Sequence, residues 1–318
     1  MRVQTIFLAV CIVAACVTVR AESLVERLGF PADARVLIVN GDDFGMNHST
    51  NVGTEMALEC GGLTSSTIMT PCPWANEALD FGKTHPQACL GVHLTQTSEW
   101  KHYKWGPVMG WKAVPTLCDS RGYFYEGPEM LYFHGDPREL EKEIRAQIDR
   151  ALAAGVDVTH VDSHMGTLNY SPGYHAIYAR VAKDYGLPAR IAASKMRELG
   201  FGYVVDKADA LGVLHPDIVE LDSWGKKEDI DAWYKNWFDN IEPGKVTELY
   251  IHCGRMTPEM EATTGSAQHR AMDTDYFCKP ETHAYIQEKG IELISYRELR
   301  ELQRTGKPMP RKTYGWKE

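Results

Sequence analysis

The sequence lacks several patterns that each indicate a common class of protein. Acidic residues outnumber basic ones by 43 to 34, and the formal net charge is −9, so the chain has no basic surface for binding nucleic acid. The glycines after the first predicted strand do not form G-x-G-x-x-G, which disfavours a dinucleotide-binding Rossmann fold. No C-x-x-C pair occurs, which disfavours a zinc ribbon. The hydrophobic content of 44% is that of a globular protein.

The N-terminal apolar run stands apart from the rest of the chain. Residues 1–21 combine a positive start, an apolar stretch that is short for a membrane span, and Val19-x-Ala21 as a cleavage site. This pattern is typical of a secretory signal peptide. Val13-Ala-Ala-Cys16 also resembles a lipoprotein box with a lipid anchor at Cys16, and an uncleaved anchor is a third reading. In each case we expect an exported protein, periplasmic or secreted, and after cleavage as a signal peptide or a lipoprotein the mature chain has no membrane span.

Removal of that segment leaves six cysteines at irregular spacing. An oxidising compartment permits disulfides, but the spacing does not reveal which cysteines pair, and buried free thiols are equally compatible with it. The six are Cys60, Cys72, Cys89, Cys118, Cys253 and Cys278.

Predicted strands and helices alternate about eight times along the remaining chain. This alternation is typical of a parallel sheet with crossover helices, and eight units at this length favour a (β/α) barrel. We therefore expect one domain over residues 22–318. The predicted strands cover 35–40, 64–70, 90–95, 156–164, 189–193, 218–221, 247–252 and 291–295, and the predicted helices cover 51–60, 77–85, 137–154, 174–185, 230–238 and 281–289.

Residues 96–135 interrupt the alternation. The segment is rich in aromatic residues, glycine and proline, and it has no helical period. An irregular insertion of this length is usually a functional loop. A small aromatic core packed on the barrel wall is an equally good interpretation.

Polar side chains interrupt the apolar strands near their C-terminal ends. Asp42 and Asp43 follow the first strand, and His93, His164 and His252 lie at the ends of three others. The carboxyl ends of barrel strands share one rim, so we expect these side chains to lie close together. Two histidines and a carboxylate suit a divalent cation with open positions, and a cation would relieve the repulsion between adjacent carboxylates. Taken alone, the Asp pair reads as a solvated turn that caps the next helix.

The fourth strand places three polar residues on one face. Because side chains alternate along a strand, His160, Asp162 and His164 point the same way. His164 is nearest the rim and is the preferred ligand. We expect His160 and Asp162 deeper, as partners of the ligands or as layers of the barrel core.

Five motifs span nearly the whole mature chain in order. They are Asn40-Gly-Asp42-Asp43-Phe-Gly, Leu90-Gly-Val-His93-Leu, Thr159-His-Val-Asp162-Ser-His164, Tyr250-Ile-His252-Cys-Gly254 and Leu293-Ile-Ser-Tyr-Arg-Glu-Leu299. Together they resemble the YdjC-like carbohydrate deacetylases, a family that includes chitooligosaccharide and hopanoid-biosynthesis deacetylases.

The resemblance implies a distorted (β/α) barrel related to polysaccharide deacetylases. It implies a metal-dependent hydrolase that removes N-acetyl groups from amino sugars in an oligosaccharide or polysaccharide. Carried over by position, Asp43, His93 and His164 correspond to the ligands of one divalent metal ion, with Zn²⁺ and Mg²⁺ both open. Asp42 corresponds to the catalytic base and His252 to the general acid.

Two departures from the family pattern leave the substrate open. Gly166 stands where the family often has a second histidine, and Cys253 stands where it usually has proline. Flat apolar faces of the kind that stack on sugar rings, together with one arginine, are expected to bind the substrate. These residues are Trp100, Trp105, Trp111, Tyr170 and Arg190.

Two other functions are compatible with the same sequence. A metal-dependent esterase or phosphoesterase could use the same rim, although phosphate substrates call for converging Arg or Lys, of which the motifs hold few. A non-catalytic, exported carbohydrate-binding protein could use the aromatic insertion and keep a structural metal.

Overall fold

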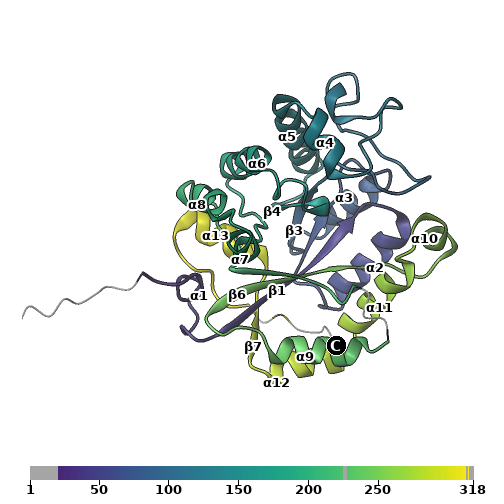
Figure 1. The fold of residues 1–318 in the computed structure, drawn as a ribbon. Helices are drawn as coiled ribbons and strands as arrows, with labels where there is room; N and C mark the ends of the chain where they lie inside the picture. The colour runs from purple at the N-terminus through teal and green to yellow at the C-terminus, as the bar shows by residue number, and fades with distance from the viewer. Residues whose placement is uncertain (1–20, 225–227, 313, 315–318) are drawn as a thin grey trace, which may run out of the picture.

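The computed structural model describes residues 21–224, 228–312 and 314 (Figure 1). In this part of the chain, seven parallel strands form one sheet in the order β4-β3-β2-β1-β6-β5, and β7 pairs with β1. The strands are β1 (Arg35–Phe44), β2 (Ser65–Ile68), β3 (Leu90–Leu94), β4 (Val158–Ser163), β5 (Ile218–Leu221), β6 (Lys245–His252) and β7 (Ile291–Leu293).

Helices surround this sheet. Figure 1 shows α5 and α6 together on one side of the strands, with α9 and α12 on the opposite side. The helices are α1 (Leu24–Arg27), α2 (His48–Glu59), α3 (Ala75–Thr84), α4 (Pro128–His134), α5 (Pro137–Ala153), α6 (Pro172–Tyr185), α7 (Ala193–Glu198), α8 (Gly202–Ala210), α9 (Ile230–Asp239), α10 (Pro258–Thr263), α11 (Ala267–Phe277), α12 (Pro280–Glu288) and α13 (Tyr296–Thr305), with 3-10 turns η1 (Pro115–Leu117) and η2 (His164–Gly166).

Strand β1 lies at the centre of the sheet. One edge pairs along its length with β6, and the other edge pairs first with β7 through residues 35–37 and then with β2 from Asn40 onward. Its apolar residues are buried on both faces, as in parallel sheets that helices cover on both sides. The Asp42-Asp43 end of β1 is therefore fixed in the middle of the fold.

The predicted strand at 189–193 is wrong. Only Ala189 forms a bridge, to Val161 in β4, and α7 already begins at Ala193. The backbone N–H of Ala189 donates to the loop residue Leu214 rather than to β5, while the next side chain, Arg190, turns into the interior to pair its charge. Within the described residues the sheet thus forms a half-barrel, open between β4 and β5. The other seven predicted strands are confirmed to within a few residues.

The six predicted helices are confirmed, with ends that differ by at most three residues. Helix α11 is the most important of those that the sequence analysis missed. Its buried side carries His269, Arg270, Asp273 and Thr274, so it lacks the apolar stripe by which an amphipathic helix is recognised.

The aromatic insertion contains the small aromatic core that was one of the two readings of this segment, and its function as a loop stays a prediction. The rings of Trp100, Tyr103 and Trp105 pack with centroids 5.8–6.2 Å apart, which is a small core. The segment is mostly irregular but contains helix α4. Glu143 of α5 accepts hydrogen bonds from the backbone N–H groups of Val108 and Met109 and so ties the insertion to the barrel wall.

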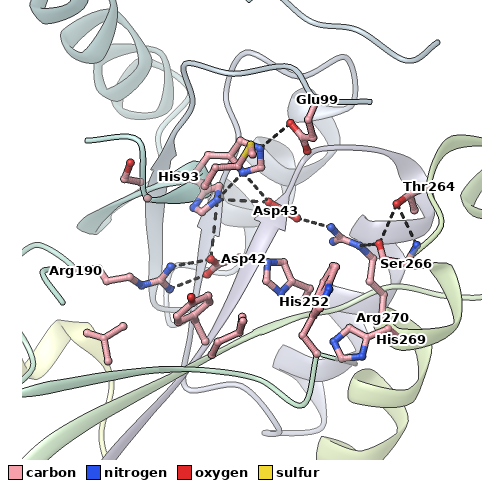
Figure 2. A pocket seen from close by; sticks show the side chains of 18 of the residues that line it. Asp42, Asp43, His93, Glu99, Arg190, His252, Thr264, Ser266, His269 and Arg270 are labelled. Atoms are coloured by element: carbon pink, nitrogen blue, oxygen red, sulfur yellow. Dashed lines mark hydrogen bonds and ion pairs between the residues drawn. The ribbon is translucent and has the colours of Figure 1, made fainter. Parts of the chain in front are cut away.

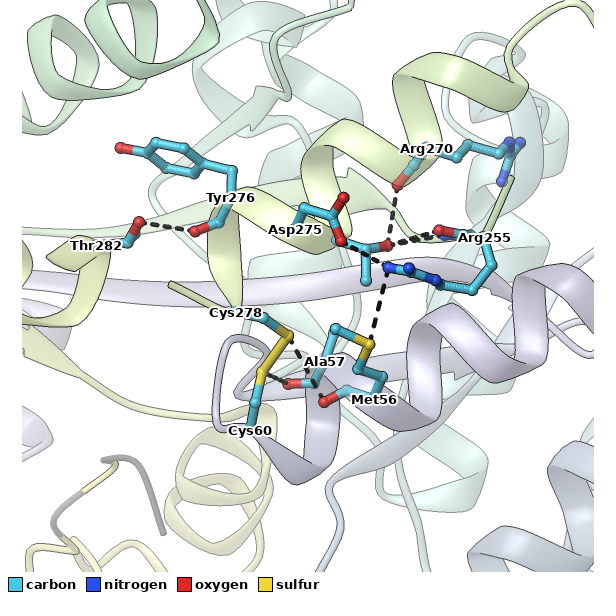
Figure 3. The surroundings of a disulfide bond; sticks show 11 residues. Met56, Ala57, Cys60, Arg255, Arg270, Asp275, Tyr276, Cys278 and Thr282 are labelled. Carbon is cyan, nitrogen blue, oxygen red and sulfur yellow. Dashed lines mark hydrogen bonds and ion pairs between the residues drawn. A yellow bond between two sulfur atoms is a disulfide. The ribbon is translucent and has the colours of Figure 1, made fainter. Parts of the chain in front are cut away.

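A disulfide joins Cys60 and Cys278, 218 residues apart in sequence. The two cysteines follow α2 and α11, so the bond fixes the C-terminal ends of these helices together (Figure 3). The other cysteines in the described residues are free and buried, namely Cys72, Cys89, Cys118 and Cys253.

No helix among the described residues is both long and apolar enough to cross a membrane. The predicted signal segment is not part of this finding, because residues 1–20 lie outside the described residues.

Candidate active site

The C-terminal end of β1 points its two carboxylates in different directions. Asp43 has a positive φ of 67°, a backbone conformation that is uncommon for residues other than glycine and that often marks functional sites. Asp42 pairs with Arg190, whereas Asp43 pairs with Arg270. Neither caps the following helix: Asn47 is the N-cap of α2 and accepts from the N–H of Thr50. The helix-cap interpretation of the Asp pair is therefore wrong.

Three of the predicted site residues bring one ligand atom each to a common point. Asp43 Oδ1 lies 3.4 Å from both His93 Nε2 and His164 Nδ1, and the two nitrogens are 3.1 Å apart. All three side chains are buried. Figure 2 shows His93 and Asp43 of this triad pointing toward each other.

The chemistry of this triad fits a divalent metal ion. Atoms spaced this way match the edge of a tetrahedron of ligands with bonds of about 2.1 Å. Asp43 Oδ1 is buried and has no hydrogen-bond partner, which is costly unless something else satisfies it. Two imidazoles and one carboxylate are a common ligand set for transition metals, with nitrogen donors favouring zinc over magnesium.

Each histidine of the triad has a carboxylate on its other ring nitrogen. His93 Nδ1 lies 2.7 Å from Asp162 Oδ1, and His164 Nε2 lies 3.0 Å from Glu99 Oε2. Such partners orient metal-binding histidines and raise their basicity. Burial alone would lower the pKa of His164, but the charges of Glu99 and Asp43 raise it to about 9. The expectation that Asp162 lies beneath the ligands as their partner agrees with this geometry.

His160 occupies the core below the site. Its ring stacks on Tyr296 at 3.8 Å, and Nε2 contacts Asn40 Oδ1 at 3.1 Å. Burial and the nearby charge of Arg190 hold its pKa well below the usual value. His160 is therefore a neutral, packed residue of the barrel core, which is one of the two positions that the alternation along the strand predicted for it.

Glu99 provides a test of the metal site that does not depend on activity. We expect Glu99→Gln to weaken zinc binding by about 10-fold, because the amide holds His164 less firmly and no longer raises its basicity. Zinc titration of metal-depleted protein against a competing chelator would measure this. Glu126→Gln is the matched control, since Glu126 belongs to the same insertion but pairs with Lys104. Equal zinc affinity in the Glu99 variant and the wild type would contradict a supporting role.

Asp42 lies beside the triad and is held by an arginine. Both of its oxygens accept hydrogen bonds of 2.7 Å from Arg190, and Oδ2 lies 4.0 Å from His93 Nε2. Burial would raise the pKa of Asp42, but the charges of Arg190 and His93 outweigh that effect and lower it. Asp42 therefore remains an ionised carboxylate next to the triad.

His252 lies across the same pocket. On neighbouring strands β1 and β6, Asp42 and His252 are register partners. His252 Nδ1 lies 2.8 Å from Asp222 Oδ2, so its other nitrogen is free to face a ligand. The ring of Trp224 lies against it at 5.2 Å.

A cavity of about 780 Å³ connects these groups. The predicted substrate-binding residues differ in their relation to it. Trp100 and the half-exposed Tyr170 line the cavity, as does Arg190. Trp105 is only 2% exposed and packs behind Trp100, and Trp111 is 53% exposed but is not part of the cavity wall.

Arg190 has a different environment from the one expected of a substrate ligand. Its guanidinium is buried and contacts Asp42, Asp162 and Glu248 within 3.1 Å. These carboxylates engage its donors, and two of its hydrogen bonds go to Asp42. The sequence shows the residue type but not these partners.

Four further residues line or support the site and were not predicted: Glu99, Asp222, His269 and Arg270. Asp222 directly follows β5, a position where polar residues gather in barrels, so its place at a strand end was a usable signal. Arg270 binds Asp43 Oδ2 at 2.7 Å from a helix that was not predicted. No sequence pattern marks Glu99 within the irregular insertion.

Known proteins share this sequence pattern and this fold. The family described as YdjC-like protein matches residues 36–288. A carbohydrate deacetylase from Thermoanaerobacter pseudethanolicus is 35% identical over 262 residues, which cover 82% of this chain and 98% of that protein. A carbohydrate deacetylase from Brevibacillus brevis is 28% identical over 263 residues, covering 83% and 99%. A candidate cellobiose-phosphate cleavage protein from Enterococcus faecalis V583 has a similar structure, with a TM-score of 0.73 and 24% identity over 84% of this chain and 99% of that one.

Proposed function

Because this chain belongs to the YdjC-like protein family, we propose that it is a carbohydrate deacetylase. It removes N-acetyl groups from amino sugars in an oligosaccharide or polysaccharide and depends on one divalent metal ion. The observation that carries this proposal is the convergence, in one cavity, of the Asp43, His93 and His164 triad with an ionised carboxylate and a paired histidine. The deacetylase names of the relatives support the reaction class.

The roles of the residues follow from their contacts. Asp43, His93 and His164 would hold the divalent ion, which would supply a water of lowered pKa and a polarised acyl oxygen. Asp42 is the general base: Arg190 fixes both of its oxygens beside the triad, where its ionised carboxylate accepts the proton of the attacking water.

His252 is the general acid. Its Nδ1 is bound to Asp222, which fixes the ring and leaves Nε2 to donate a proton to the departing amine. An amine is a poor leaving group unless it is protonated, so this donation is needed for an amide more than for an activated ester.

The lining of the cavity suits a sugar. Trp100, Tyr170 and Trp224 offer aromatic faces around polar groups that can bond hydroxyls. A phosphoesterase has less support, because the two arginines of the lining, Arg190 and Arg270, are already paired with carboxylates. A non-catalytic sugar-binding protein would not need Asp42 and His252 beside the triad.

Acetate release tests this function directly. The protein incubated with N-acetylated chitooligosaccharides should release acetate, a chelator should abolish the release, and added Zn²⁺ should restore it, because the triad depends on an ion for its chemistry. Enzymatic acetate determination would measure it. Binding of the sugars with no acetate released under any metal condition would contradict the proposal.

Export is also part of the proposal. The signal-like N-terminus supports it, and so does the Cys60–Cys278 disulfide, since such bonds persist mainly in oxidising compartments.

A further inference from the structure

His269 lies on the far side of Asp222 from the proposed general acid. Asp222 Oδ2 contacts His252 Nδ1 at 2.8 Å, while Asp222 Oδ1 contacts His269 Nε2 at 3.1 Å. One carboxylate is thus shared between two imidazoles. Figure 2 shows His252 and His269 close together at the edge of the pocket.

The surroundings of His269 keep it charged. Its Nε2 also lies 3.1 Å from Asp273 Oδ2, and the two residues are four apart on α11, on one face of the helix. His269 is only 3% exposed. Burial would lower its pKa, but the hydrogen bonds to Asp222 and Asp273 raise the pKa to about 9, so it is an imidazolium between two carboxylates.

Further hydrogen bonds hold the two carboxylates of this cluster. The Tyr234 hydroxyl donates to Asp273 Oδ1 at 2.8 Å, and the backbone N–H of Trp224 donates to Asp222 Oδ1 at 2.8 Å. The Trp224 ring lies against both imidazoles, 5.2 Å from His252 and 4.6 Å from His269. Asp222 therefore has Trp224 and His269 on one oxygen and His252 alone on the other.

We propose that His269 is a positioning residue for the general acid: its imidazolium holds Asp222 so that the free oxygen of this carboxylate orients His252 toward the leaving amine. This rests on the proposed deacetylase function. Asp222 directly follows β5, and its backbone N–H donates to the carbonyl of Tyr250 in the neighbouring strand β6. The contact from His269 of α11 adds to the backbone hydrogen bond from Trp224 and holds the same oxygen of this carboxylate from a second side.

A comparison of substrates with different leaving groups distinguishes this positioning role from a purely structural one. His269→Gln should lower kcat for an N-acetylated chitooligosaccharide by about 10- to 100-fold. This is a partial loss of the roughly 10²- to 10⁴-fold acceleration that a general acid contributes. KM should change by less than about 2-fold, because His269 is nearly buried and acts through Asp222. Hydrolysis of 4-nitrophenyl acetate should fall by less than about 3-fold, since this leaving group departs without a proton.

Tyr234→Phe is the matched control. It removes a partner of Asp273 but none of Asp222, so it should keep the wild-type ratio of amide to ester rates. If His269→Gln does not fold because the buried Asp273 loses its cation, the double variant His269→Gln/Asp273→Asn removes both charges and serves the same test.

The outcomes are distinguishable. An equal loss on both substrates, or no loss on the amide, overturns the positioning role while acetate release by the wild type upholds the deacetylase function. If the wild type releases no acetate from the oligosaccharide, the proposed function itself fails.

Discussion

Replacing Asp42 with asparagine should lower kcat for deacetylation by about 10³-fold and leave the bound metal in place. The amide cannot take a proton from water, and general bases contribute about 10² to 10⁴ in rate. The fold should persist, because the asparagine oxygen still accepts a hydrogen bond from Arg190, which is buried against it. Acetate-release kinetics and elemental analysis of the same sample would measure both effects.

The neighbouring carboxylate provides the control. Asp43→Asn should lose both metal and activity, because Asp43 Oδ1 is one of the three converging ligand atoms. Two adjacent acids would then give different phenotypes. A fully active Asp42→Asn enzyme would remove Asp42 as the base, and loss of metal from it would show that Asp42 is a ligand instead.

Replacing Arg190 with methionine should cost about 3–5 kcal/mol in the free energy of unfolding. The substitution leaves Asp42, Asp162 and Glu248 buried together without their cation, and breaking a buried ion pair on one side has costs of this order. Urea unfolding followed by circular dichroism would measure the loss. Arg138→Met is the control: Arg138 pairs with Asp136 at the surface, so the midpoint should not move.

The direction in which stability changes with pH follows from the pKa of Asp42. Its pKa in the folded wild type is lowered because Arg190 and His93 outweigh the effect of burial, so its pairing stabilises the fold above the unfolded pKa near 4 and is lost as pH falls through the folded pKa. Without Arg190, less positive charge opposes the effect of burial on the pKa of Asp42. This pKa rises, and the carboxylate is protonated more easily. The stability difference between wild type and Arg190→Met should therefore narrow from pH 7 to pH 5; a constant difference would contradict this account.

The triad could be predicted because its residues follow local rules. Asp43, His93 and His164 each lie at or just beyond the carboxyl end of a predicted strand, and the carboxyl ends of parallel strands meet at one edge of a sheet. Periodicity also located the regular helices and seven of the strands. Each of these signals is contained in a single segment of the chain. The topology of a parallel sheet then brings the ends of the segments together.

The supporting residues could not be predicted in the same way. Asp222 and His269 come together only because β5 and α11 are neighbours of β6 in space. The buried side of α11 is largely polar, so the sequence does not show the apolar pattern by which this helix could be recognised. Arg190 looked like a substrate ligand because a sequence does not show that three carboxylates already surround it. In the same way, the order of aromatic residues in the insertion does not distinguish Trp100, on the cavity wall, from Trp105 behind it.

The Cys60–Cys278 disulfide changes the effect of proteolytic cleavage on the protein. The bond from Cys60 to Cys278 closes a covalent ring that contains the aromatic insertion and most of the active-site residues, with Asp42 and Asp43 just outside it. A single cut anywhere within this ring leaves both fragments covalently attached. The peptide chain can thus be nicked once in a surface loop without the molecule separating into two parts.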